Sequence, residues 1–248
     1  MDTSRWRVET FASLDSTNTW VAEQARAGAA EGLVARTDFQ TAGRGRLDRV
    51  WVAPPGTSLL CSVLLRPAVA DDARQLVVAT VALALRAAIT KLTARTPDLK
   101  WPNDVLFGNQ KVAGILAELV TSAAGPAVVV GLGVNCLSVD PAFAHATSLS
   151  AATGVDVDPS TLLHEVLLEL ESLRPLLDRP AGLVVLRSLY YEALSTVGQF
   201  LTITTPDGVV TGVGVGVDES GRLEVDVQGH HRVFDVGDVV HVRPQEKQ

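Results

Sequence analysis

The sequence predicts an α+β protein: a large part that mixes helices with strands, then a small β-barrel. In the first three quarters of the chain, apolar residues recur at both strand and helix spacing. Asp158 followed by Pro159 is a strong helix start, because an Asp cap precedes a proline at the first helical position. After Ser195 the pattern changes to five short β-type runs separated by turn residues, which is typical of a small barrel. We therefore expect two domains, residues 1–195 and 196–248.

The expected elements of the first domain follow from caps, breakers and periodicity. Asp15 and Ser16 are good N-cap residues and Gly28 is a good stop, so a helix should run to about Ala27. Gly108–Asn109 suits a hairpin turn. Further helices are expected over Asp71–Thr93, from Pro159 to about Leu173, and over Leu183–Leu194. Strands are expected over Val8–Leu14, Gly32–Phe39, Ser58–Leu65, within Asp98–Val128, and over Ala127–Asn135.

Composition narrows the class of protein. Of the 248 residues, 47% are hydrophobic and 20% charged, as in a folded globular chain, and the net charge of −7 argues against a nucleic-acid partner. Cys61 and Cys136 lie in apolar runs, so we expect both to be small buried residues. They suggest neither a disulfide framework nor a metal site. The N-terminus lacks a signal-peptide pattern, and the longest apolar runs, Leu76–Leu85 and Ala127–Val134, are short for a bilayer. We therefore expect a cytoplasmic protein without a membrane partner.

Two segments near the N-terminus suggest a ligand. Ser16-Thr17-Asn18 at a helix start is explained most simply by capping, although one hydroxyl could face a polar ligand. The loop Gln40–Trp51 combines glycines that permit close backbone approach with arginines suited to phosphate or carboxylate; these are Gly43, Arg44, Gly45, Arg46 and Arg49. Its simpler interpretation is an exposed basic hairpin. A dinucleotide-binding fingerprint is rejected, because Asp48 replaces the third glycine and no helix follows.

Two later segments add charged and glycine-rich positions. Lys100-Trp101-Pro102-Asn103-Asp104 places a cation and a carboxylate where proline interrupts a strand, although a solvated turn would also explain it. Lys111 begins the run that includes Gly114 and Leu116, and a second run carries Gly131, Gly133 and Asn135. Glycines inside strands indicate that something approaches the backbone there.

Taken together, and in this order, these segments resemble the biotin protein ligase family over about residues 8–243. Gly43-Arg44-Gly45-Arg46, Lys100-Trp101-Pro102-Asn103-Asp104, and Lys111 with Gly114-Ile115-Leu116 are specific as a set. The resemblance implies a catalytic domain related to class II aminoacyl-tRNA synthetases and an SH3-like C-terminal barrel. It also implies an enzyme that forms biotinyl-5'-AMP from biotin and ATP with Mg²⁺, and then transfers biotin to a lysine of a biotin carboxyl carrier domain.

The resemblance also assigns roles to residues. Ser16, Thr17, Gln40 and the loop at Gly43 and Arg44 should hold the ureido ring of biotin. Gly114, Leu116 and Gly131 should line its apolar slot. Asn18, Gly45 and Gly133 are further candidates for ligand binding. Arg46, Arg49 and Lys111 should face the phosphates and the biotin carboxylate, while Trp51 and Asn135 should contact adenosine. Lys100, Asn103 and Asp104 should lie near the reacting centre, with Asp104 a candidate to orient the carrier amine. Metal ligands are left unassigned.

Two departures from the family pattern qualify the resemblance. Asp48 stands where the family usually has glycine, which bears on the shape of the loop. Larger members carry an N-terminal helix-turn-helix domain, whereas the first strand expected here begins near Val8, so the short type without DNA binding is expected.

Three alternatives remain open at this point. The nearest is another acyl–protein ligase, such as a lipoate ligase on a related fold. A second is a biotin-responsive regulator that binds a partner without chemistry. The third is an α+β protein without this specialisation, which requires the four segments to agree by chance. The sequence leaves monomer and homodimer equally open.

Overall fold

A seven-stranded mixed sheet forms the centre of the protein. The computed structural model describes residues 5–47, 49–68, 74–205, 208–235 and 237–241. The strands lie in the order β1-β2-β3-β7-β6-β5-β4; β1 and β2 are parallel and the other neighbours antiparallel. Their bounds are β1 (Arg7–Phe11), β2 (Leu33–Thr37), β3 (Ser58–Leu65), β4 (Asp98–Lys100), β5 (Asp104–Phe107), β6 (Gln110–Ser122) and β7 (Gly125–Asn135).

The helices begin where caps predict them. Ser16 caps α1 by accepting a hydrogen bond from the Thr19 amide, and Asp158 caps α4 by accepting from the Ser160 and Thr161 amides. Each cap satisfies amides that have no partner within the helix. The helices are α1 (Thr17–Arg26), α2 (Arg74–Thr93), α3 (Leu149–Thr153), α4 (Pro159–Leu173), the 3₁₀ helix η2 (Arg174–Asp178) and α5 (Pro180–Ala193).

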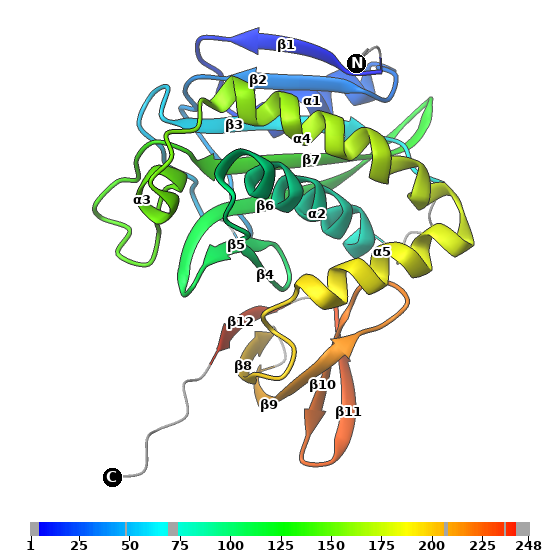
Figure 1. Ribbon diagram of the computed structural model, residues 1–248. Coiled ribbons are helices and arrows are strands. Elements are labelled where there is room, and N and C mark those ends of the chain that lie inside the picture. The colour runs from blue at the N-terminus through cyan, green and yellow to red at the C-terminus, as the bar shows by residue number, and fades with distance from the viewer. Residues whose placement is uncertain (1–4, 48, 69–73, 206–207, 236, 242–248) are drawn as a thin grey trace.

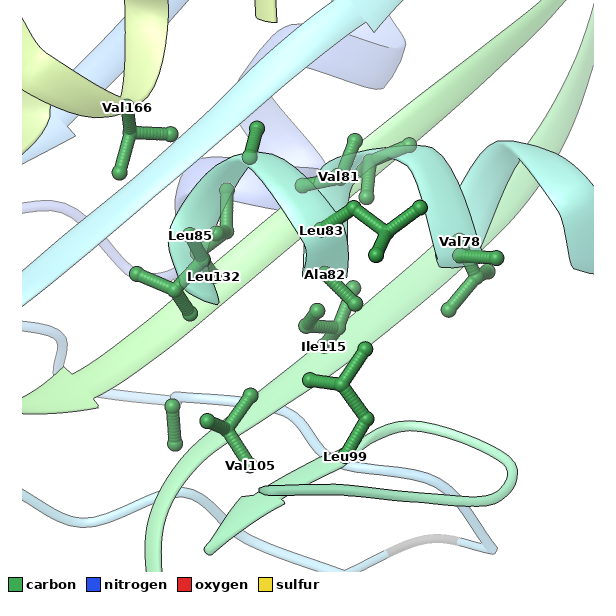
Figure 2. Close-up of a cluster of buried hydrophobic side chains, with 14 of the residues drawn as sticks. Val78, Val81, Ala82, Leu83, Leu85, Leu99, Val105, Ile115, Leu132 and Val166 are labelled. Atoms are coloured by element: carbon green, nitrogen blue, oxygen red, sulfur yellow. The ribbon is translucent and has the colours of Figure 1, made fainter. Parts of the chain in front are cut away.

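Helices cover both faces of this sheet, and the two faces have different cores. Figure 1 shows α2 and α4 lying across one face. Figure 2 shows apolar side chains of α2, such as Val81 and Leu85, near Ile115 and Leu132 of the strands, all within one buried cluster. A second cluster joins α1 to the opposite face; its members are Val21, Ala22, Ala25, Leu33, Ala35, Leu64, Val120, Ala127 and Val129. The face that carries α1 also carries the candidate site.

Helix α2 differs from one expectation. Over Gln75–Thr93 it is long and apolar enough to cross a membrane by length and composition, although its uninterrupted apolar run was expected to be too short. Within the fold, 72% of this window is buried, and the helix belongs to the main hydrophobic cluster. This burial is what a core helix requires.

The C-terminal part forms a second, five-stranded antiparallel sheet. Its order is β11-β10-β9-β8-β12, with bounds β8 (Phe200–Thr205), β9 (Gly208–Val217), β10 (Leu223–Val227), β11 (His230–Phe234) and β12 (Asp238–His241). Five strands were expected, and the described residues of this part form five. The expected closure is absent from the described residues, in which β11 and β12 form the two edges without a ladder between them.

The second sheet is joined to the first beside the candidate site. The buried Trp101 donates its Nε1–H to the Gly221 carbonyl at 3.2 Å, and its amide donates to Thr196 Oγ1 at 3.0 Å. The Ser195 amide donates to the Leu99 carbonyl at 2.8 Å. Figure 1 shows the second sheet beyond the β4–β5 end of the first. The segment that carries Lys100 and Asp104 therefore touches both sheets.

Several local expectations needed correction. Helix α5 begins at Pro180 instead of Leu183, because a proline is favoured at the first helical position. The expected interruption by proline is confined to residues 101–103, because Lys100 and Asp104 pair with each other. Helices α3 and η2 were not anticipated. Asp48 and Asp71, which entered the predictions, lie outside the described residues.

Both cysteines are buried and free, in agreement with their apolar surroundings. Burial raises the pKa of the Cys61 thiol to about 12, with Cys136 adding to this and Arg36 opposing it. Burial also raises the pKa of Cys136 to about 12. Both therefore remain neutral thiols at physiological pH.

Candidate active site

The floor of the site is a patch of sheet that contains three glycines. Gly133 of β7 pairs with Gly114 of β6 on one side and with Leu60 of β3 on the other, and the next row joins Gly131 to Leu116 and Ser62. Because side chains on a strand alternate between faces, the two glycines of β7 lie on the same face as α1. The bare backbone there gives other groups room to approach.

Two larger side chains occupy that room. A Cβ at Gly131 would overlap the side-chain amide of Asn18, and one at Gly133 would overlap the indole of Trp51. A Cβ at Gly114 would lie 3.0 Å from Lys111 Nζ and 3.1 Å from Trp51 Cζ3. The three glycines predicted from the strand pattern therefore have a physical reason: each admits a side chain that lies across the sheet.

A cavity of about 250 Å³ opens above this floor. Nearly all the predicted site residues line it: Ser16, Thr17, Asn18, Gln40, Arg44, Gly45, Arg46, Arg49, Trp51, Lys100, Asn103, Asp104, Lys111, Gly114, Leu116, Gly131, Gly133 and Asn135. The exception is Gly43, whose carbonyl accepts a hydrogen bond from the Trp51 amide at 3.0 Å. Gly43 therefore bears on the shape of the loop instead of on the cavity wall.

The start of α1 brings three polar side chains to one end of the cavity. Ser16 is the helix cap, as the simpler interpretation of this segment held. Thr17 donates its amide to Gln40 Oε1 at 2.8 Å, and its hydroxyl lies 3.1 Å from the same oxygen. Asn18 Nδ2 donates to the Leu116 carbonyl at 3.2 Å and to Glu118 Oε1 at 2.7 Å. This end is a wall of oriented amide and hydroxyl groups.

The loop Gln40–Trp51, called the Gly/Arg loop from here on, folds back on itself as a short irregular hairpin. Arg44 and Val50 form an isolated antiparallel bridge, and the Gly45 amide donates to the Arg49 carbonyl at 2.7 Å. Arg44 Nη2 pairs with Glu118 Oε2 at 3.0 Å. Leu47 and Val50 are exposed at its tip. The expected basic hairpin is therefore present, and it forms one side of the cavity.

Arg46 connects three separate parts of the chain. Its Nη1 donates to Asn103 Oδ1 at 3.2 Å, and its Nη2 donates to the Gly237 carbonyl at 3.3 Å. Asn103 in turn donates to the Ile115 carbonyl at 2.8 Å. Val239 of the second sheet also lines the cavity. The second sheet therefore contributes to the wall of the site.

Lys111 and Asp104 form an ion pair at the cavity wall. Lys111 Nζ lies 2.5 Å from Asp104 Oδ1 and 5.7 Å from the centre of the Trp51 ring. The face of an indole attracts a cation. Both ends of the pair are partly exposed, at 35% and 24% of their side chains, so both are accessible to a ligand.

Charge in the cavity is strongly one-sided. Its described lining carries five cationic side chains and a single carboxylate, that of Asp104; the cations are Arg44, Arg46, Arg49, Lys100 and Lys111. Such an excess of positive charge within a partly enclosed site favours anionic ligands. Asn135 is a neutral residue of the same lining; it is buried and donates its Nδ2 to the Thr147 carbonyl at 3.1 Å.

Two positions that contact the predicted site residues were missed from the sequence. Ser62 lies within a buried apolar strand, with its Oγ 2.7 Å from Thr17 Oγ1 and 2.5 Å from Asn18 Oδ1. Glu118 follows Gly114 and Leu116 at a spacing of two along β6, so it shares their face. That spacing was the available signal for Glu118, and a lone hydroxyl in the run Ser58–Leu65 was the signal for Ser62.

Comparison with known proteins identifies the family. Residues 10–135 match the model of the biotin/lipoate A/B protein ligase family, and residues 196–242 match that of the biotin protein ligase C-terminal domain. The chain is 36% identical to the biotin--[acetyl-CoA-carboxylase] ligase of Mycobacterium tuberculosis, over 97% of this chain and 91% of that one. The chain belongs to the biotin protein ligase family.

Two further members of the family resemble this biotin protein ligase, one in sequence and one in its solved structure. The bifunctional ligase/repressor BirA of Bacillus subtilis is 30% identical, over 89% of this chain and 70% of that protein. The solved biotin protein ligase from Aquifex aeolicus, in complex with biotin and ATP, superposes with a TM-score of 0.82 at 26% identity, covering 96% of this chain and 99% of that one. Membership of the biotin protein ligase family, which the four sequence segments indicated, is confirmed.

Proposed function

We propose that this biotin protein ligase condenses biotin with ATP to form biotinyl-5'-AMP and pyrophosphate, and then transfers biotin to a lysine of a biotin carboxyl carrier protein with release of AMP. One observation supports this most strongly: five cations and a wall of oriented amide and hydroxyl groups share a single cavity. The relative from Aquifex aeolicus was solved with biotin and ATP, and the relative from Mycobacterium tuberculosis is named for acetyl-CoA carboxylase.

Biotin is assigned to the α1 end of the cavity. Its ureido ring presents two N–H donors and one carbonyl acceptor. The hydroxyls of Ser16 and Thr17, the amides of Asn18 and Gln40, and the loop at Arg44 and Gly45 offer both kinds of partner. Gly114, Leu116, Gly131 and Gly133 form the apolar floor beside them. Gly43 supports this end indirectly, through its hydrogen bond to the Trp51 amide.

ATP is assigned to the end that carries Trp51, Lys111 and Asn135. Biotin carboxylate and the α-phosphate are both anionic, and two unit charges 4 Å apart repel by about 4 kcal/mol at an effective dielectric of 20. Lys111, Arg46 and Arg49 offset this repulsion and stabilise charge that develops on the phosphoryl oxygens. Catalysis of the first step is therefore mainly positioning and electrostatics.

The second step needs a neutral carrier lysine. Asp104 is the carboxylate in the described lining, so we assign to it the orientation of that amine, with Lys100 and Asn103 beside it. Occupation of Lys111 by phosphate would release Asp104 from its ion pair for this role. Arg46, which joins the loop to Asn103 and Gly237, helps to keep water from the mixed anhydride.

Mg²⁺ fits this cavity only as a companion of ATP. The described residues contain no cluster of three or more His, Cys, Asp or Glu side chains that could hold a metal. Mg²⁺ commonly binds through one or two carboxylates together with substrate phosphates. Asp104 is the carboxylate positioned for this, and when bound the ion would neutralise phosphate charge.

The domain division, the cellular location and the oligomeric state of the enzyme are also proposals. We divide the chain between residues 195 and 196 into a catalytic domain like that of class II aminoacyl-tRNA synthetases and an SH3-like domain. The change from mixed elements to five consecutive strands supports this division. We place the enzyme in the cytoplasm, where ATP is supplied, as a monomer or homodimer. Its net charge of −7 argues against nucleic acid as a binding partner.

The experiment is ATP-dependent labelling of a purified biotin carboxyl carrier domain, followed by mass spectrometry. The expected product carries one biotin on a lysine and requires both ATP and biotin. Because the matching family model also covers lipoate ligases, a parallel reaction with lipoate separates the two activities. Labelling by lipoate and not by biotin would reject the proposal.

A further inference from the structure

A chain of side-chain contacts borders the biotin end of the cavity. It runs through Gln40, Thr17, Ser62, Asn18, Glu118 and Arg44, and its five contacts lie between 2.5 and 3.1 Å. Its two end members, Gln40 and Arg44, both belong to the Gly/Arg loop of residues 40–51. The chain of contacts therefore ties that loop to α1, β3 and β6.

The direction of donation along part of this chain is fixed by chemistry. Asn18 Nδ2 faces the Glu118 carboxylate and the Leu116 carbonyl, which can only accept. Its Oδ1 must therefore face Ser62, whose single hydroxyl proton is donated to it. Ser62 then has no proton left for Thr17, so the single hydroxyl proton of Thr17 is donated to Ser62, and Gln40 Oε1 is held by the Thr17 amide at 2.8 Å.

Glu118 joins Asn18 to Arg44 through its two carboxylate oxygens. Oε1 accepts from Asn18 at 2.7 Å, and Oε2 accepts from Arg44 at 3.0 Å. Its side chain is 26% exposed and is not part of the cavity lining. It therefore reaches the ligand only through these two residues.

We infer that Glu118 is a positioning residue for biotin. It holds the Asn18 amide in one orientation and anchors the Gly/Arg loop through Arg44. This inference rests on the proposed function, because it takes biotin as the ligand at this end. A side-chain amide has only one acceptor oxygen, so Glu118→Gln cannot serve both partners and removes the charge that Arg44 meets.

The test compares Glu118→Gln with the parent by titration calorimetry and steady-state kinetics. We expect the Kd and the KM for biotin to rise about tenfold, the effect of roughly one charge-assisted hydrogen bond. The kcat at saturating biotin should stay within about threefold, because uniform binding is lost while the reacting groups are unchanged. The matched control is Glu165→Gln, which removes the ion pair with Lys91 between α4 and α2 and should leave the Kd for biotin at the parent value.

A double-mutant cycle with Arg44→Ala completes the test. Arg44→Ala leaves the contact between Glu118 and Asn18 intact and removes a half-exposed side chain, so it remains informative if Glu118→Gln fails to fold. The two changes should raise the Kd for biotin by less together than the product of their separate effects. A parental Kd in both single variants, or strictly multiplicative effects, would overturn the inference. If the parent itself forms no biotinyl-5'-AMP, the proposed function fails instead.

Discussion

The ammonium of Lys111 lies 2.5 Å from the carboxylate of Asp104, at the wall of the cavity where β5 and β6 pair. A phosphate that binds Lys111 must compete with this carboxylate. We therefore propose that the pair keeps the lysine in place before ATP arrives, and that binding of ATP frees Asp104 for the second step. This relationship links the two half-reactions that we assign to the site.

Lys111→Ala should slow adenylation strongly. Loss of one preorganised charge donor costs about 2–4 kcal/mol of transition-state stabilisation, or roughly 30- to 1,000-fold in rate. Biotin-dependent exchange of pyrophosphate into ATP measures this step alone. Lys91→Ala, which removes a lysine paired with Glu165 away from the cavity, is the control and should keep the parent rate. Unchanged exchange in Lys111→Ala would refute the role of this residue.

Arg46→Gly should release activated biotin. Its guanidinium joins the loop to Asn103 and to Gly237 of the C-terminal part, so its removal should loosen the cover over the adenylate. We expect the enzyme-bound biotinyl-5'-AMP to be lost about tenfold faster, as for one hydrogen bond to a charged group. Filtration of preloaded enzyme at timed intervals measures this loss. Retention as long as in the parent would show that Arg46 does not hold the adenylate.

Gly133→Ala should weaken ATP binding. The added Cβ would overlap the indole of Trp51, which must then move away from the floor of the site. An ATP Kd raised by about one to two orders of magnitude is expected from 1–3 kcal/mol of overpacking strain. Gly216→Ala is the matched control in the second sheet, where the nearest atom to a new Cβ is the flexible carboxylate of Glu224 at 3.3 Å. Equal ATP affinity in the two variants would contradict our assignment of Trp51.

The sequence predicted most of the elements because their signals are local. The Ser16 and Asp158 caps lie where expected, and β3 has the bounds that its apolar run indicates. The closure of the C-terminal strands was not found among the described residues, because pairing of β11 with β12 depends on tertiary geometry that turn signals do not specify. Local chemistry therefore gives elements more reliably than it gives their pairing.

Much of the candidate site was also predictable, but not how its residues are connected. Glycines inside strands correctly indicated close approach at Gly131 and Gly133, although the approaching groups, Asn18 and Trp51, could not be named. Ser62 and Glu118 were missed because each acts through partners more than 40 residues away in the chain. Hydrogen bonds across such separations exist only once the sheet has formed.

Acid should weaken the contact between η2 and the segment that follows β3. Burial tends to raise the pKa of Asp178, but hydrogen bonds from the Ala68 amide and from Arg174, together with the positive charges of Arg174 and Arg5, outweigh it and hold that pKa below its usual value. The stabilisation is therefore complete above the unfolded pKa, near 4, and is lost as the pH falls through the lowered folded value.

Asp178→Asn should accordingly lower the free energy of unfolding by about 1 kcal/mol at pH 7, since this carboxylate is partly exposed and screened. Urea denaturation at pH 7 and at pH 2.5 should show the difference from the parent shrinking at the lower pH. A difference that is the same at both values would mean that the ionised carboxylate contributes no stability.

The most direct test of the account is transfer of biotin to a carrier domain by the parent enzyme and by Lys111→Ala, measured in the same assay with ATP and again with synthetic biotinyl-5'-AMP. We predict that the parent labels one carrier lysine from either donor. The variant should fail with biotin and ATP but label from the adenylate, because Lys111 stabilises formation of the anhydride and not its aminolysis. Equal labelling by the two proteins from biotin and ATP would contradict the central claim that cations gathered in this cavity drive activation.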